Sequence, residues 1–318
     1  MKTTQLRTAL AGVLLASGVL ATAVGVTRHD GDDNPPRATA ALTAPQGPYV
    51  ALGDSYTAGP RIPGQTGTPV GCARSDHNYP SLVARQLGIR ATDFRDMSCS
   101  GATTADLTAP QRTKEGTNPA QFTALSARTR LVTLGIGGND IGFGTMIKRC
   151  VGMGAVYHAL GSGKYVPGDT PCERLNNRDG SDQVQQKIDA VGSRLTDALK
   201  DIERRAPQAR VYVVGYPAIL PTDSTDCERE MSLAPGDMTY LREKERELNA
   251  ELRERAEADG AAYVDTYTPS EGHDACSAEA DRWIEPLVPS SPAAAVHPNT
   301  RGEQGMADAV LRTLSTTH

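Results

Sequence analysis

A serine lies at the end of a short apolar run, where a buried strand would give way to a turn and a helix. Gly-Asp-Ser at positions 53–55 follows the run Tyr49–Leu52. In an open α/β sheet, a hydroxyl at the carboxyl end of a strand projects into the crevice that binds ligands. The α/β-hydrolase elbow G-x-S-x-G does not fit, because Thr57 stands two residues after Ser55. Ser55 is therefore a candidate nucleophile, and an ordinary turn is the alternative interpretation.

Two further blocks are shaped like loops that follow strands. Residues 98–104 read Ser-Cys-Ser-Gly-Ala-Thr-Thr, and the apolar run Leu131–Leu134 leads into Gly-Ile-Gly-Gly-Asn-Asp at 135–140. A dinucleotide or phosphate loop fits poorly, because the third glycine of G-x-G-x-x-G is missing and no Gly-Lys-Ser/Thr follows. Ester hydrolysis through a serine needs hydrogen-bond donors for the oxyanion, and these blocks offer backbone N–H groups and an amide side chain.

The same chemistry needs a general base, for which histidine is the usual residue. Four of the six histidines lie near a chain end or in segments expected to be irregular: His29, His77, His158 and His318. His273 and His297 remain as candidates. His297 begins the block His-Pro-Asn, which precedes a helix-like stretch at Glu303–Leu314.

The order of Gly-Asp-Ser, Ser-Gly-Ala, Gly-Gly-Asn-Asp and His-Pro-Asn resembles the SGNH (GDSL-type) hydrolase superfamily from Tyr49 to the end of the chain. Gly-His-Asp-Ala-Cys at 272–276, Trp-Ile-Glu-Pro at 283–286 and the six cysteines are similar to secreted actinobacterial esterases, lipases and phospholipases. The resemblance implies a flavodoxin-like α/β/α fold. We expect no cofactor and no metal-ligating residues, while the sequence leaves metal dependence of the activity open.

The resemblance also implies the roles of individual residues. Ser55 would be the nucleophile and His297 the base. The oxyanion donors would be the backbone N–H groups of Ser55 and Gly101 and the side-chain amide of Asn139. Gly101 has an independent rationale, since a residue without a Cβ lets its backbone approach the substrate closely.

The sequence departs from the superfamily pattern beside the base. An aspartate commonly stands three residues before the histidine, whereas this chain has Ala294 there. We therefore expect a Ser-His dyad in which a backbone carbonyl accepts the Nδ1–H bond, as in some secreted relatives. Trp283, Ala294 and Ala295 are the candidate carbonyls, and a distant carboxylate of Asp265 or Asp274 is the alternative. A carbonyl fixes the tautomer but stabilises an imidazolium less than a carboxylate does.

Six cysteines accompany a leader typical of exported proteins: Cys72, Cys99, Cys150, Cys172, Cys227 and Cys276. An even number in an exported chain predicts disulfides. No C-x-x-C occurs, so a zinc or iron–sulfur site is not favoured. The resemblance implies the sequential bridges Cys72–Cys99, Cys150–Cys172 and Cys227–Cys276. Two of them would brace the site, because Cys99 adjoins Ser100-Gly101 and Cys276 ends the block at 272–276.

The leader itself has twenty uncharged residues between Arg7 and Arg28, preceded by Lys2. A basic start before an apolar run indicates a secretory signal, although this run is also long enough for an uncleaved membrane anchor. We expect residues 1–40 to be a signal peptide or N-terminal anchor with a linker, and residues 41–318 to be one hydrolase domain. The protein would then be secreted, or membrane-anchored if the leader stays.

The composition limits the partners. The formal net charge is −5 and no basic stripe occurs, which excludes a nucleic-acid partner. Aromatic residues make up only 4% of the chain, so the core must be mainly aliphatic, which suits a parallel sheet buried on both faces. We expect a monomer that takes a small-molecule or lipid ester, and transient contact with a membrane or lipid surface is left open.

Strand-like and helix-like segments alternate, which predicts a three-layer α/β/α sandwich with a central parallel sheet. The expected strands are Tyr49–Asp54, Thr92–Ser98, Leu131–Gly135, Val211–Gly215 and Ala262–Asp265. The clearest expected helices are Tyr79–Leu87, Asp182–Ala206 and Pro235–Asp259, the last with Met238, Leu241, Leu248, Leu252 and Ala256 on one face. Segments 59–78, 105–119 and 141–179 are expected to be loops.

The sequence therefore predicts a secreted, cofactor-independent serine hydrolase that cleaves carboxylic (acyl or lipid) esters through an acyl-enzyme. Removal of acetyl groups from a polysaccharide is a second hypothesis. A non-catalytic cell-surface binding module is a third hypothesis. Loss of the serine or the histidine would have favoured it, but both Ser55 and His297 are present. Asp54 and Asp140 are expected to hold their turns rather than to act as paired glycosidase carboxylates.

Overall fold

The computed structural model describes residues 47–160, 164, 168–177, 181–222 and 227–316. The expected leader, residues 1–40, lies outside the described residues. None of the described helices is long and apolar enough to cross a membrane. All described residues belong to one compact unit, Leu42–His318.

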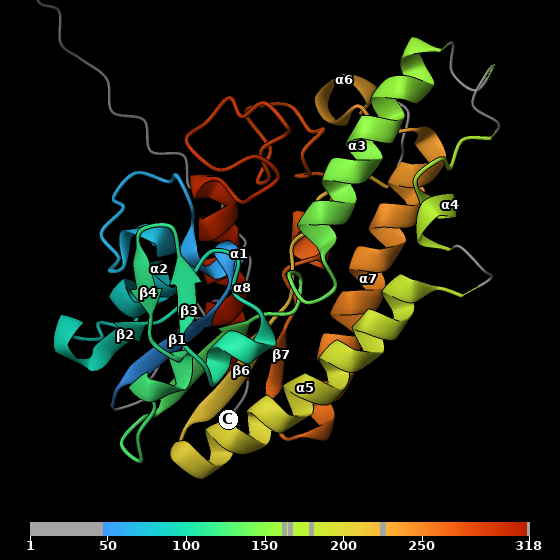
Figure 1. Cartoon of the computed structure of the whole chain (residues 1–318). Helices are drawn as coiled ribbons and strands as arrows, with labels where there is room; N and C mark the ends of the chain where they lie inside the picture. Colours follow the sequence, from blue (N-terminus) through green and yellow to red (C-terminus); the bar gives the residue numbers. More distant parts are fainter. Residues whose placement is uncertain (1–46, 161–163, 165–167, 178–180, 223–226, 317–318) are drawn as a thin grey trace, which may run out of the picture. The chain divides into compact units, whose positions relative to one another are not determined.

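Five parallel strands form the central sheet in the order β2-β1-β5-β6-β7 (Figure 1). Their bounds are Phe94–Asp96 (β2), Tyr49–Gly53 (β1), Leu131–Gly135 (β5), Arg210–Val214 (β6) and Ala262–Val264 (β7). Every residue of β1 and β5 is buried, as expected where helices cover both faces of a parallel sheet. Strand β2 is shorter than the expected Thr92–Ser98.

Helices cover the two faces of this sheet, and Figure 1 shows α5 and α7 running side by side. The four covering helices are α2 (Tyr79–Gln86), α5 (Gln183–Arg205), α7 (Pro235–Ala258) and α8 (Thr300–Thr316). Alternate residues of β1 divide the core between the faces: Val50 and Leu52 belong to the cluster that α5 and α7 complete, and Tyr49 and Ala51 to that of α2 and α8. The predicted three-layer sandwich is therefore confirmed.

Side chains fix where the long helices begin. Asp182 caps α5 by accepting from the N–H groups of Val184 and Gln185, and Asn78 caps α2 by accepting from Ser81. Such caps satisfy N–H groups that have no partner within the helix. Lys244 of α7 also donates to Asp182 at 2.5 Å, which ties the two helices of one face together.

The strand order places a topological switch between β1 and β5. From β1 the chain passes to β2 on one side and then crosses to β5 on the other. In open α/β sheets, ligands bind at the carboxyl ends of the strands at such a point. Here the end of β1 is held by Gln121, whose side chain accepts from Gly53 N at 2.8 Å and donates to Gly53 O at 2.9 Å.

Two segments expected to be loops contain regular structure. Segment 141–179 contains α3 (Phe143–Ala159) and α4 (Glu173–Asn176), joined by the disulfide Cys150–Cys172. Segment 105–119 contains an antiparallel hairpin of β3 (Gln111–Thr113) and β4 (Gly116–Asn118). The loop prediction is wrong for both, and His158 lies on α3 rather than in an irregular stretch.

The other helical elements within the described residues are short. They are α1 (Ser55–Ala58), α6 (Glu228–Met231) and the 3-10 turns Val70–Cys72, Ala91–Asp93, Thr104–Leu107, Gln121–Ala124 and Thr268–Ser270.

Helix α3 offers a matched pair of glycines that tests its packing. A methyl group at exposed Gly152 would meet nothing within 4 Å, whereas one at buried Gly154 would overlap the backbone of Ser232. We expect Gly152→Ala to raise the free energy of unfolding by about 0.5–1 kcal/mol. Gly154→Ala should lower it by about 1–3 kcal/mol through overpacking. Urea unfolding measures both, and equal effects of the two substitutions would contradict the packing of α3 described above.

Candidate active site

Ser55 is the first residue of α1, and only Asp54 separates it from the end of β1. Asp54 caps this short helix, with its Oδ1 accepting from Tyr56 N at 2.9 Å. Ser55 is buried except for 9% of its surface and lines a cavity of about 410 Å³ at the carboxyl edge of the sheet. The sequence pattern thus places a hydroxyl at the switch point, where a ligand can reach it.

His297 meets this hydroxyl from the far end of the chain. Its Nε2 lies 2.8 Å from Ser55 Oγ, and its Nδ1 lies 2.8 Å from the carbonyl oxygen of Ala295. A carbonyl oxygen can only accept, so Nδ1 must carry the proton. In the neutral ring Nε2 is then free to accept the serine proton, which is the tautomer that a general base needs.

A strained turn lets the ring reach a carbonyl only two residues before it. Val296 has φ 59°, a left-handed conformation that β-branched residues rarely adopt and that costs about 1–3 kcal/mol. Several bonds hold it in place: Tyr56 Oη donates to Val296 O at 2.7 Å, Val296 N donates to Glu285 O at 2.9 Å, and Glu285 N donates to His297 O at 3.0 Å. The Trp-Ile-Glu-Pro block therefore supports the base.

Of the other groups considered for orienting His297, Trp283, Asp265 and Asp274 have hydrogen-bond partners elsewhere. Trp283 O accepts from Asn299 N at 2.8 Å. Asp265 accepts from Thr268 and Arg253, and Asp274 accepts from Cys276 N at 2.9 Å. Ala294 donates its N–H to Pro60 O. Of the candidates named from the sequence, Ala295 is the one whose carbonyl accepts the hydrogen bond from His297 Nδ1.

Gly101 and Asn139 line the same cavity as Ser55 and His297. Asn139 Nδ2 donates to Ala102 O at 2.9 Å, which leaves its second N–H for a ligand. Gly101 has φ 82°, and a Cβ there would come no closer than 3.8 Å to another residue. The need for glycine therefore comes from the left-handed backbone, not from lack of space.

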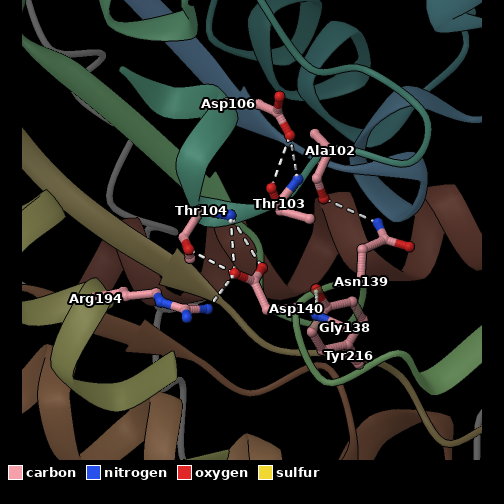
Figure 2. A network of polar contacts seen from close by, with 9 residues as sticks. All are labelled: Ala102, Thr103, Thr104, Asp106, Gly138, Asn139, Asp140, Arg194 and Tyr216. Carbon is pink, nitrogen blue, oxygen red and sulfur yellow. Dashed lines mark hydrogen bonds and ion pairs between the residues drawn. The ribbon is translucent and has the colours of Figure 1, made fainter. Parts of the chain in front are cut away.

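A buried carboxylate clamps these two blocks together (Figure 2). Asp140 accepts from Thr104 N at 3.0 Å, from Thr104 Oγ1 at 2.5 Å and from Arg194 at 3.1 Å. The Asp140 side chain is 2% exposed and that of Arg194 is 56% exposed. Asp140 thus holds a turn, as expected from the sequence, and fixes the loop of Gly101 against Asn139.

A second link was missed by the sequence reasoning. Tyr216 Oη donates to Asp54 Oδ2 at 2.6 Å and accepts from Gly138 N at 2.8 Å, joining the ends of β1, β5 and β6. Burial raises the pKa of Asp54 to about 7, against the hydrogen bonds from Tyr216 and Tyr56. The sequence signal for Tyr216 was weak: it directly follows the strand that was expected to end at Gly215.

Desolvation also sets the electrostatics of the base. Removal of the His297 ring from water lowers its pKa below the ordinary histidine value, the Ala295 carbonyl opposes this shift, and the positive charge of Lys148 adds to it. The neutral, proton-accepting form of the imidazole is therefore favoured. Among the residues that the structure describes, no group of three or more His, Cys, Asp or Glu side chains could hold a metal ion.

Two disulfides brace the edges of the site. Cys72–Cys99 lies directly before Ser100, whose N–H donates to Cys72 O at 3.0 Å. Cys227–Cys276 anchors the block at 272–276, where Ala275 N donates at 3.0 Å to the carbonyl of Ile219 in the cavity wall. Together with Cys150–Cys172, these are the sequential pairs that the sequence resemblance implies.

Comparison with known proteins gives consistent matches. The sequence pattern of the GDSL-like Lipase/Acylhydrolase family matches residues 51–304. The chain is 38% identical to Lipase 2 of Streptomyces coelicolor over 97% of each chain, and 30% identical to an esterase of Streptomyces scabiei over 80% of this chain and 82% of that one. Among solved structures, phospholipase A1 from Streptomyces albidoflavus superposes with a TM-score of 0.67 at 27% identity, over 86% of this chain and 99% of that one. An extracellular lipase from Streptomyces rimosus superposes with a TM-score of 0.64 at 26% identity, over 86% of this chain and 100% of that one.

The loop clamp can be separated from its exposed ion pair by substitution. Asp140→Ala would leave the buried N–H of Thr104 without an acceptor, so we expect the free energy of unfolding to fall by about 1–3 kcal/mol. Arg194→Ala removes only the exposed partner and should cost at most about 1 kcal/mol. Denaturant unfolding of both variants is the measurement. An Arg194→Ala cost as large as that of Asp140→Ala would show that the ion pair, not the turn, holds the loops.

Proposed function

Because the chain belongs to the GDSL-like Lipase/Acylhydrolase family and is a carboxylic-ester hydrolase, we propose that it cleaves acyl esters through an acyl-enzyme on Ser55. The general base would be His297, oriented by a backbone carbonyl without a carboxylate. The observation that carries this proposal is the pair of 2.8 Å contacts of the imidazole, one with Ser55 Oγ and one with Ala295 O.

In the first half-reaction, Ser55 Oγ attacks the ester carbonyl carbon while its proton passes to His297 Nε2. The carbonyl oxygen becomes an oxyanion, which accepts hydrogen bonds from the N–H groups of Ser55 and Gly101 and from the amide of Asn139. The C–O bond to the alcohol then breaks, and the imidazolium returns the proton to the departing alkoxide. An ester of Ser55 and a free alcohol remain.

In the second half-reaction, water replaces the alcohol. His297 Nε2 removes one proton from the water as its oxygen attacks the acyl carbon, and the same three donors stabilise the second oxyanion. Collapse breaks the bond to Ser55 Oγ, and the proton on Nε2 passes to that oxygen. The products are the carboxylic acid and the regenerated serine.

The apolar lining of the cavity favours esters whose acyl group is longer than acetate. Large apolar side chains from α3, α7 and the segments around them enclose the space beside Ser55: Phe143, Ile147, Ile219, Leu248 and Leu287. A chain of several methylene groups would gain about 0.8 kcal/mol for each CH₂ that it buries there. Acetate would leave most of this surface unused.

We also propose that the protein is exported, with residues 1–40 as a signal peptide or anchor and residues 41–318 as the hydrolase domain. The basic start and apolar run of the leader support this, as do the three disulfides. Action as a monomer and transient contact with a lipid surface remain predictions from the sequence.

Substitution of the two reacting groups tests the mechanism. Ser55→Ala and His297→Ala should each lower kcat on p-nitrophenyl esters by roughly 10⁴–10⁶-fold, and Asn139→Ala by about 10²–10³-fold through the lost oxyanion donor. Circular dichroism verifies the fold of each variant. Full activity of Ser55→Ala would end the proposal.

A matched control tests the absence of a carboxylate partner. The double variant Asp265→Asn/Asp274→Asn keeps the size of both side chains but removes their negative charge. If neither acid orients His297, a folded double variant should retain wild-type kcat. A collapse of kcat in a folded double variant would show that one of these acids orients the base.

The pH dependence of kcat/KM follows from the lowered pKa of His297. The base must be neutral to accept a proton, so kcat/KM should rise with pH and level off, with the midpoint of the acid limb below the ordinary histidine value of about 6.5. The profile of Asp54→Asn is the control, because Asp54 lines the same cavity and its pKa is raised to about 7. A midpoint near that value in the wild type that disappears in Asp54→Asn would assign the limb to Asp54 instead.

A further inference from the structure

The apolar wall of the cavity is interrupted by one acid from α7. Glu245 is 2% exposed and lines the cavity beside Leu248, Ile219 and Tyr56. The mechanism proposed above makes no use of this side chain. A buried carboxyl in an apolar wall needs an explanation, because such groups are costly to remove from water.

The sequence position of Glu245 makes the acid more unusual. The buried stripe of α7 repeats every three or four residues, through Met238, Leu241, Leu248 and Leu252. Position 245 falls within this stripe, four residues after Leu241 and three before Leu248, where the helical period calls for an apolar side chain. A leucine would fit the pattern, and carboxyls that break such a local rule tend to mark functional sites.

The hydrogen bonding of the carboxyl is incomplete. Its Oε2 accepts from Ile219 N at 3.2 Å. Its Oε1 is buried and has no hydrogen-bond partner in the structure. One oxygen therefore has a structural role, while the other has no partner within the protein although its residue lines the cavity.

The surroundings favour a neutral carboxyl. Burial raises the pKa of Glu245 well above its usual range, the Ile219 N–H opposes this, and the charge of Asp274 raises the pKa further. The other titratable groups that interact with Glu245 are the phenols of Tyr56, Tyr263 and Tyr267. A neutral carboxyl can donate a hydrogen bond from one oxygen and accept one on the other.

We propose that Glu245 is a specificity-determining residue, whose free carboxyl oxygen donates a hydrogen bond to an oxygen atom carried on the chain of the ester substrate. The preferred substrates would then be esters with an ether, hydroxyl or second ester oxygen at a fixed distance from the scissile carbonyl. This inference rests on the proposed function, because it places the substrate beside Ser55. A plain alkyl chain would leave Oε1 without a partner, whereas an oxygenated chain would supply one and so stabilise the transition state more.

The oxygen could belong to the acid or to the alcohol of the ester, so the experiment has two arms. In the first, p-nitrophenyl alkanoates are compared with esters in which one CH₂ of the acyl chain is replaced by an ether oxygen, moved stepwise along the chain. In the second, the same replacement is made in the alcohol of esters of one common acid. The measured quantity is the ratio of kcat/KM between the oxygenated and the plain substrate of equal length.

We expect one oxygen position in one arm to raise kcat/KM by roughly tenfold in the wild type. Glu245→Gln should keep this preference, because an amide can accept from Ile219 and still donate into the cavity. Glu245→Leu should abolish or reverse it. The control Glu243→Leu, on an exposed position of the same helix, should leave the ratio unchanged.

Three results would overturn the proposal. The first is no preference at any position in either arm, which would mean that solvent satisfies the carboxyl. The second is a preference that persists in Glu245→Leu. The third is a preference that is lost in Glu245→Gln as it is in Glu245→Leu. The amide still offers a neutral donor, so this loss would show that hydrogen-bond donation to the substrate oxygen is not the cause of the preference. Activity on the plain esters and its loss in Ser55→Ala report on the proposed function separately from these ratios.

Discussion

The hydrogen bond between His297 Nδ1 and the Ala295 carbonyl is the constraint on which the rest of the site depends. It selects the tautomer that directs an unprotonated Nε2 at Ser55, and without it the ring could present either nitrogen. A carbonyl carries only a partial charge, so it stabilises an imidazolium less than an aspartate would. Burial and Lys148 disfavour the imidazolium further. In the proposed mechanism, more of the transition-state stabilisation then comes from the oxyanion donors.

Two of those donors, Gly101 and Asn139, lie in loops, and polar side chains hold these loops in place. Asp140 joins the segment of Gly101 to that of Asn139, and Tyr216 bridges Asp54 and Gly138. The side chains of Asp140, Asp54 and Tyr216 are almost entirely buried, and in the protein interior a hydrogen bond is stronger than in water and its loss is costly. Oxyanion donors need this precision, because a displacement of about 1 Å can cost 10²-fold in rate. The parallel sheet beneath supplies the common edge from which these segments emerge.

The sequence predicted the layers of the fold and named Ser55 and His297, which lie 2.8 Å apart in the structure, because both inferences depend on local patterns. Apolar runs that end in Gly-Asp-Ser and Gly-Gly-Asn-Asp mark strand ends, and the sheet brings these ends together. Helix α3 was missed because its glycines lower helix propensity, although Phe143, Met146, Ile147 and Cys150 follow a helical period. The partner of Nδ1 could only be narrowed to a few groups, because the choice of Ala295 depends on the left-handed turn at Val296. No local pattern of residue types announces that turn.

Three interior acids show how the same chemical group serves different ends. Glu285 accepts from Asn299, Ser290 and Ser291, and these donors lower its pKa although burial opposes them; it remains charged and supports the turn before the base. Asp54 also has two donors, but burial outweighs them and raises its pKa to about 7. Glu245 has one donor and one oxygen without a partner.

Fold stability explains Glu285 and Asp54, because both oxygens of each carboxyl have hydrogen-bond partners within the protein. It does not explain the third, since an apolar residue at that position would avoid the cost of desolvation. In the inference drawn above, a substrate oxygen compensates Glu245, which lines the same cavity as Ser55.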